Sequence, residues 1–227
     1  MSRNICIIPA RGGSKRIPRK NIKDFLGKPI IAYSIEMALE TELFEEVMVS
    51  TDDSEIAEIA ESYGAKIPFL RSNETSNDYA TTASVIREVV KMYKNIGREF
   101  DSVCCLYPTA VLANSADICE GYELLNEVDI VLPVTEFSFP PLRSFHVNEK
   151  GLAEYRYPEH VNTRSQDLEP WYHDAGQWYW YQIKCFEKEL EIYERKVIKL
   201  SNTRVQDIDN MDDWRQAELK FQTLDKL

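Results

Sequence analysis

The chain has 227 residues, which is enough for one sizeable α/β domain. Its formal net charge of −11 argues against general nucleic-acid binding, and it holds no run of roughly 20 apolar residues that could span a membrane. The N-terminus shows no apolar signal segment, and the five cysteines include no C-x-x-C pair. We therefore expect a cytoplasmic location, no disulfide framework and no zinc site.

Short apolar strands and amphipathic helices are predicted to alternate along the first part of the chain. Strands are expected at 4–9, 47–51, 66–70, 103–107 and 130–134. Helices are indicated between them by apolar side chains three or four residues apart, as at Ile86, Val89 and Tyr93. Pro29 suits the first residue of a helix, and the polar stretch 52–54 can cap the next one. This alternation predicts a mostly parallel sheet with helices on both faces.

The pattern changes over residues 139–172, where prolines and aromatic residues become frequent. The segments on either side of 148–151 could form a hairpin around that turn. Strands at 177–183 and 197–200 and a C-terminal amphipathic helix then restore the earlier alternation. We interpret 1–227 as a single domain with an insertion at about 139–172 that covers the site or contacts a second subunit.

The loop after the first strand carries the first chemical signal. It runs Ala10, Arg11, Gly12, Gly13, Ser14, Lys15, Arg16, Ile17, Pro18, Arg19, Lys20, Asn21. The two glycines let the backbone approach a ligand closely, and successive N–H groups in such a turn can form an anion-binding concavity. Ligands bind outside the carboxyl ends of strands in such sheets, so the loops after Pro9, Thr51 and Tyr107 should meet at one crevice. We interpret the loop as a phosphate site rather than a solvated basic loop.

This loop differs from two common phosphate-binding motifs. A Walker loop needs Gly-Lys followed by Ser or Thr just before a helix, but here Ser14 precedes Lys15. The G-x-G-x-x-G pattern of dinucleotide sites is also absent. The motif therefore indicates phosphate binding of another kind.

A pair of carboxylates at Asp207 and Asp209 forms the second signal. In an extended segment, side chains two residues apart point to the same side. Magnesium binds through one or two carboxylates together with substrate phosphates. The alternative is an acidic cap on the C-terminal helix, but a phosphate loop elsewhere in the chain favours a magnesium site.

Together these two motifs resemble those of the CMP-sialic acid synthetase family, also called acylneuraminate cytidylyltransferases. The resemblance runs from 7–15 to 207–209 and includes 26–30 and 49–52. It implies a Rossmann-like nucleotidyltransferase fold, usually in a homodimer formed by an inserted segment. It also implies transfer of CMP from CTP to an acidic nine-carbon sugar for surface glycan synthesis, with Mg²⁺ as cofactor and no nucleic-acid or membrane partner.

Three segments resemble the branch of that family that acts on pseudaminic acid. They are 104–110, 172–180 and 205–209. Tyr107 stands where the sialic acid branch has Gln, and Ala113 stands where it has Arg. N-acetylneuraminate, legionaminate and 3-deoxy-octulosonate remain alternative substrates, and a non-catalytic CTP sensor is the alternative outside the enzymes. RNA binding through 16–23 is disfavoured by the acidic balance.

The resemblance also implies roles for individual residues. The expected catalytic residues are Arg11, Lys20 and Asp207. The expected nucleotide-binding residues are Ala10, Arg11, Gly12, Gly13, Ser14, Lys15, Asn21, Arg71 and Thr82. The expected metal ligands are Asp207 and Asp209. The expected sugar-side residues are Tyr107, Arg164, His173, Asp174 and Gln177. About half of the aromatic cluster around 171–181 is interpreted as core packing.

Overall fold

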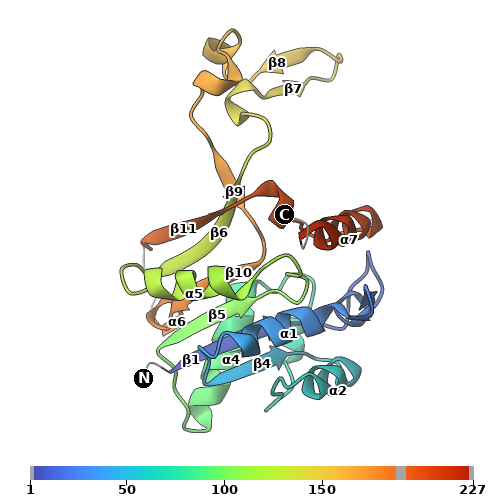
Figure 1. Ribbon diagram of the computed structural model, residues 1–227, viewed down its shortest axis with the longest axis vertical. Helices are drawn as coiled ribbons and strands as arrows, with labels where there is room; N and C mark the ends of the chain where they lie inside the picture. The colour runs from blue at the N-terminus through green and yellow to red at the C-terminus, as the bar shows by residue number, and fades with distance from the viewer. Residues whose placement is uncertain (1–2, 188–192, 225–227) are drawn as a thin grey trace.

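The computed structural model describes residues 3–187 and 193–224, so the remainder of the expected domain 1–227 lies outside the described residues. A seven-stranded sheet forms its centre (Figure 1). Its strands are β1 Asn4–Pro9, β4 Glu46–Ser50, β5 Ser102–Leu106, β6 Ile130–Glu136, β9 Tyr172–Asp174, β10 Trp178–Gln182 and β11 Arg195–Leu200. The helices are α1 Ile30–Glu40, α2 Ser54–Ser62, α3 Asn73–Ser76, α4 Thr82–Asn95, α5 Ser115–Leu124, α6 Lys184–Glu187 and α7 Met211–Leu224.

The strands run in the order β11-β6-β10-β5-β1-β4, and β9 pairs with the outer part of β6. β1 is parallel to both β4 and β5, and β11 is parallel to β6. β10 is antiparallel to β5 and β6, and β9 is antiparallel to β6. The expected mostly parallel sheet is therefore confirmed, with two antiparallel strands that the sequence pattern did not reveal as such.

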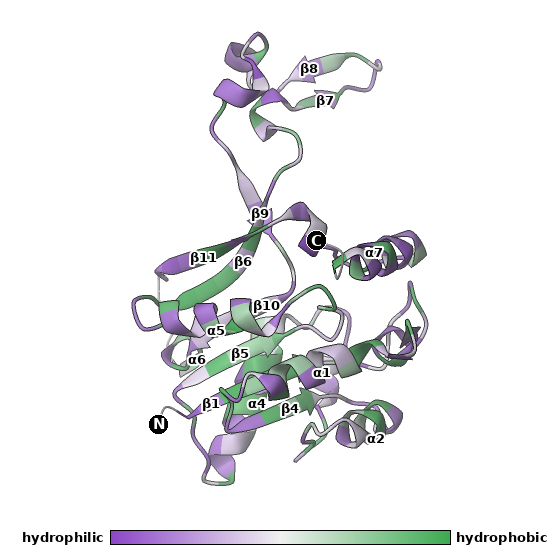
Figure 2. Ribbon diagram, viewed as in Figure 1, coloured by the Kyte–Doolittle hydropathy of each residue, from purple (hydrophilic) through white to green (hydrophobic). Residues whose placement is uncertain are grey.

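Helices cover both faces of the sheet. On one face α1, α2 and α5 contribute Ile31, Ile56 and Ile118 to a core that also contains Trp178 and Trp180. On the other face α4 supplies a second apolar cluster against the same strands. Figure 2 shows the apolar strands between these more polar helices. Within the part of the chain that the structure describes, no helix has the length and apolar character needed to cross a membrane.

Most predicted boundaries agree with the structure to within a few residues, but three expectations were wrong or incomplete. Residues 66–70 form no strand; a single bridge joins Lys66 to Met48. Pro29 is the N-cap of α1 and ends the short strand β3 Lys28–Pro29, which pairs with β2 Asp24–Phe25. β9 was not predicted, because three residues are too few to show a periodic pattern.

The insertion projects from the sheet as an arm above β6 and β9 (Figure 1). The expected hairpin is present, with β7 Phe145–Val147 pairing antiparallel to β8 Ala153–Tyr155. The 3-10 turns Pro141–Arg143, Pro158–His160 and Ser165–Asp167 complete the arm. All residues of the two strands are exposed, so the arm contributes no side chain to the buried core of this subunit.

A third apolar cluster connects the two ends of the chain. Ile17 and Phe25, which follow the first strand, pack against Ile208 and Trp214 near the C-terminus. The rings of Phe25 and Trp214 meet edge to face with centroids 5.4 Å apart. This packing brings the basic loop beside the carboxylate pair, although the two motifs are almost 200 residues apart in the sequence.

Candidate active site

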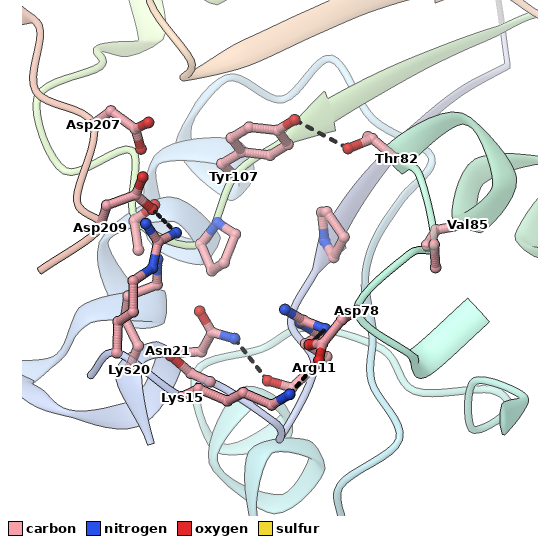
Figure 3. A pocket seen from close by; sticks show the side chains of 16 residues that line it. Arg11, Lys15, Lys20, Asn21, Asp78, Thr82, Val85, Tyr107, Asp207 and Asp209 are labelled. Atoms are coloured by element: carbon pink, nitrogen blue, oxygen red, sulfur yellow. Dashed lines mark hydrogen bonds and ion pairs between the residues drawn. The ribbon is translucent and has the colours of Figure 1, made fainter. Parts of the chain in front are cut away.

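A cleft of about 490 Å³ opens at the carboxyl ends of β1 and β5 (Figure 3). Four segments line it: the basic loop after β1, residues 78–85 around the start of α4, residues 107–109 after β5, and the pair Asp207 and Asp209. The loops after Pro9 and Tyr107 therefore meet as expected. The loop after Thr51 lies behind this lining, where it holds the basic loop in place.

The basic loop presents its cations along one side of the cleft. Five residues that the resemblance assigns to nucleotide binding or catalysis line it: Arg11, Ser14, Lys15, Lys20 and Asn21. Asn21 is buried, and its amide Nδ2 donates to the carbonyl of Arg11 at 3.0 Å, which closes the loop on itself. The loop therefore has a defined shape and can direct several positive charges at one anion.

Packing within the protein, rather than the predicted close approach of a ligand, explains the glycine at position 12. Its N–H donates to Asp52 Oδ1 at 2.9 Å, so this donor already has a partner within the protein. A Cβ on Gly12 would lie 2.6 Å from Asp53 Oδ2, whereas a Cβ on Gly13 would meet open space. Close packing against Asp53 explains Gly12, and only Gly13 leaves room for a ligand to approach the backbone.

Asp53 anchors the other end of the same loop. Its carboxylate caps α2 by accepting from the N–H groups of Glu55 and Ile56, both at 3.1 Å. It also forms a two-bond ion pair with Arg19, whose backbone lies in the left-handed region at φ 56°. Hydrogen bonding to the Arg19 guanidinium lowers the pKa of Asp53 to about 2. The sequence predicted the cap, whereas the contact with Arg19 emerges only in the fold.

Lys20 connects the basic loop to the carboxylate pair. Its Nζ donates to the carbonyl of Ile208 at 2.6 Å, and the side chain is half-buried. Burial lowers the pKa of Lys20, while the charges of Asp209 and Asp207 oppose that shift. Arg16 reaches the same pair through a 2.6 Å ion pair with Asp209. The cations of the loop thus partly neutralise the carboxylates.

The carboxylate pair can supply only some of the ligands that a divalent cation needs. Burial, followed by the charge of Asp209, raises the pKa of Asp207, so the pair would gain from a nearby cation. No group of three or more His, Cys, Asp or Glu side chains with metal-binding geometry occurs among residues 3–187 and 193–224. Two carboxylates suit Mg²⁺ if phosphate oxygens of a bound nucleotide complete its ligands.

Asp78 is a cleft residue that the sequence reasoning missed. It forms ion pairs with both Arg11, at 2.7 Å, and Lys15, two of the predicted phosphate ligands. These two hydrogen bonds lower the pKa of its carboxyl. A lone Asp in the polar stretch before α4 carries no recognisable pattern, so only the fold could place it opposite the basic loop.

A second cleft of about 470 Å³ adjoins the first, and Tyr107 and Asp207 line both. It contains the predicted sugar-side residues His173 and Asp174. Tyr179 also lines it, although the sequence reasoning did not single out this residue. The hydroxyl of Tyr107 lies 3.0 Å from Thr82 Oγ1 (Figure 3). Tyr107 therefore contacts the start of α4 and also lines the second cleft.

Six predicted residues do not line either cleft: Gly12, Gly13, Ala10, Arg71, Gln177 and Arg164. Ala10 is buried behind the loop, and Arg71 is buried with its Nε donating to Ser50 Oγ at 3.0 Å. The side chain of Gln177 is also buried, and its backbone carbonyl accepts from the N–H of Tyr107 at 2.8 Å. Arg164 lies on the arm, paired with Asp167 at 2.7 Å. Within one subunit the structure therefore brings none of these six residues to the cleft lining.

A basic loop at the carboxyl end of β1, faced by a pair of carboxylates, defines the site of an α/β nucleotidyltransferase. The sequence pattern of the cytidylyltransferase family matches residues 5–208. The chain belongs to that family and is a CTP-dependent cytidylyltransferase.

Relatives of known name agree with this assignment. The chain is 44% identical over 223 residues to the pseudaminic acid cytidylyltransferase of Campylobacter jejuni, with 96% of each chain covered. It is 38% identical over 229 residues to a Helicobacter pylori protein that is both a pseudaminic acid cytidylyltransferase and a UDP-2,4-diacetamido-2,4,6-trideoxy-β-L-altropyranose hydrolase. That match covers 99% of this chain and 44% of that protein.

Solved structures confirm the predicted fold class. The structure of CMP:2-keto-3-deoxy-manno-octonic acid synthetase complexed with CTP matches with a TM-score of 0.72 at 19% identity, covering 100% of both chains. A 4-diphosphocytidyl-2C-methyl-D-erythritol synthase from Anaerococcus prevotii matches with a TM-score of 0.66 at 13% identity, covering 97% of this chain and 99% of that one. At these identities the likeness concerns the fold alone.

Proposed function

We propose that the enzyme transfers CMP from CTP to the anomeric hydroxyl of pseudaminic acid and releases pyrophosphate, as a step toward a surface glycan. The observation that carries this proposal is the pair of adjoining clefts that share Tyr107 and Asp207. One cleft presents the cations that a triphosphate needs, and the other presents the polar groups that suit a sugar. The relative in Campylobacter jejuni favours pseudaminic acid as that sugar.

The reaction forms a bond between the anomeric oxygen and the α-phosphorus and breaks the bond to the leaving pyrophosphate. Such a transfer depends on positioning and charge stabilisation more than on covalent chemistry. In this proposal Arg11 and Lys15 bind the outer phosphates, and Lys20 stabilises charge near the α-phosphate. All three residues line the first cleft. Asp207 lines both clefts, so the anomeric end of the sugar should lie beside it.

Magnesium is part of the proposal. Asp207 and Asp209 would hold Mg²⁺, which when bound would neutralise phosphate charge and act as a Lewis acid. Their like charges and the raised pKa of Asp207 support a cation at this position. Lys20 and Arg16 balance part of the same charge in the absence of nucleotide.

We also propose that two copies associate through the arm, in the cytoplasm where CTP is made. Phe139, Phe145, Val147 and Leu152 are between 55% and 85% exposed there, which is unusual for large apolar side chains of a monomer. No Arg or Lys of the described chain lines the second cleft, although an acidic sugar needs a cation partner. A second subunit would offer one from its own arm, where Arg164 lies.

The test of the proposed function is a panel of sugar acids supplied with CTP and Mg²⁺ while pyrophosphate release is measured. Pseudaminic acid should give the highest kcat/KM, ahead of N-acetylneuraminate, legionaminate and 3-deoxy-octulosonate. A Lys20→Ala variant prepared in the same way controls for contaminating activity. Binding of CTP without pyrophosphate release from any acid would instead identify a nucleotide sensor.

A further inference from the structure

Tyr179 and Asp174 form a hydrogen-bonded pair on the wall of the second cleft. The Tyr179 hydroxyl lies 2.9 Å from both Asp174 Oδ1 and Oδ2. Gly176 donates its N–H to Oδ1 at 2.7 Å. A carboxylate offers about four acceptor positions, so this one retains capacity for a donor from a ligand.

Among residues 3–187 and 193–224, no cation forms an ion pair with Asp174. Its partners are a neutral hydroxyl and a backbone N–H. A fixed negative charge on a cleft wall repels another anion and accepts a strong hydrogen bond from a neutral N–H or O–H. The carboxylate of an acidic sugar must therefore lie away from Asp174, and a neutral donor of the sugar must face it.

The fold holds the Tyr179 hydroxyl rigidly. Tyr179 lies on β10 between β5 and β6, and its ring meets Tyr107 edge to face at 5.5 Å and stacks on Tyr181 at 6.2 Å. Burial raises the pKa of Tyr179, so the phenol remains a donor at physiological pH. A ring held in this way leaves the hydroxyl little choice of direction.

We propose that Tyr179 is a positioning residue that orients Asp174 to accept a hydrogen bond from an acylamino N–H of the acceptor sugar. This inference rests on the proposed function, because it assigns part of the sugar to the second cleft. Asp207, shared with the nucleotide cleft, faces the anomeric end, whereas Asp174 belongs to the second cleft alone. Asp174 would thus recognise a substituent on the ring rather than the reacting hydroxyl.

The test compares Tyr179→Phe with Tyr181→Phe. Tyr181 lies two residues along the same strand, lines neither cleft, and its hydroxyl makes no hydrogen bond to another described residue. Tyr179→Phe should raise the KM for pseudaminic acid about 10-fold, which corresponds to about 1.4 kcal/mol. It should change the KM for CTP and the kcat at saturating sugar by less than 2-fold, which corresponds to less than ~0.4 kcal/mol. Tyr181→Phe should leave all three constants unchanged.

Asp174→Asn provides a second variant in case the first folds poorly, and it should raise the same KM by at least as much. An unchanged sugar KM in Tyr179→Phe, or equal rises in both KM values, would overturn the inference while the wild-type activity stands. A wild-type enzyme that is inactive with pseudaminic acid would overturn the proposed function, and this inference with it.

Discussion

The ammonium group of Lys20 donates a 2.6 Å hydrogen bond to the carbonyl of Ile208, the residue that separates Asp207 from Asp209. This contact joins the basic loop to the carboxylate pair. It fixes a half-buried positive charge where nucleotide phosphates and a divalent cation would meet. The first prediction tests that placement.

Lys20→Ala should lower kcat about 100-fold, because a lost charge-stabilising donor costs on the order of 3 kcal/mol at the transition state. Pyrophosphate release measures the rate, and circular dichroism checks the fold. Lys91→Ala, on the exposed side of α4, is the matched control. An unchanged kcat would remove Lys20 from this role.

Asp209→Asn should raise the Mg²⁺ concentration needed for half-maximal activity about 10-fold, since it removes one of two anionic ligands. Asp212→Asn is the control, because Asp212 is exposed and its carboxylate pairs with Arg215 on α7. Activity would be titrated with MgCl₂ at saturating CTP. Equal magnesium curves for both variants would contradict the metal assignment.

Asp78→Asn should lower the KM for CTP severalfold. The Asp78 carboxylate forms ion pairs with Arg11 and Lys15, so phosphates must displace it before they can bind to these two cations. The gain should shrink at high salt, because exposed charges are then screened. Glu74→Gln, on the neighbouring helix α3, controls for the loss of one negative charge. A higher KM in Asp78→Asn would show that Asp78 supports nucleotide binding.

Asp53→Asn should lower the free energy of unfolding at pH 7 by about 1–2 kcal/mol, because Asn keeps the helix cap but loses the ion pair with Arg19. The folded pKa, about 2, lies below the usual 3.8, so this stabilisation is present above pH 4. It is lost as the pH falls toward 2. Urea unfolding across pH 2–7 measures it, with Glu61→Gln on α2 as control, and a pH-independent difference would contradict the account.

Phe145→Asp should convert a dimer into a monomer, because it places a charge in an exposed apolar patch on the arm. Light scattering after size-exclusion chromatography gives the mass. Lys150→Asp, at the turn of the same hairpin, adds negative charge outside the patch and should leave the mass unchanged. A wild-type protein that is already monomeric would refute association through the arm.

The local patterns of the sequence determined most elements and both chemical motifs. In β10, Trp178 and Trp180 point to one face of the sheet and Tyr179 points to the other. This alternation follows from the two-residue period of an extended strand. The basic loop and the Asp207–Asp209 pair are each contiguous in the chain, so their chemistry could be recognised without knowing the fold.

Only the tertiary structure decided which of these groups meet. Asp78 lies 63 residues from Lys15, and no periodicity links them. Arg71 and Arg164 carry the same charge, yet one is buried against β4 and the other stands on the arm. Sequence patterns report each residue's relation to its chain neighbours. Contacts between distant segments depend on strand order and side-chain packing, which placed Lys20 on Ile208 and made the two motifs one site.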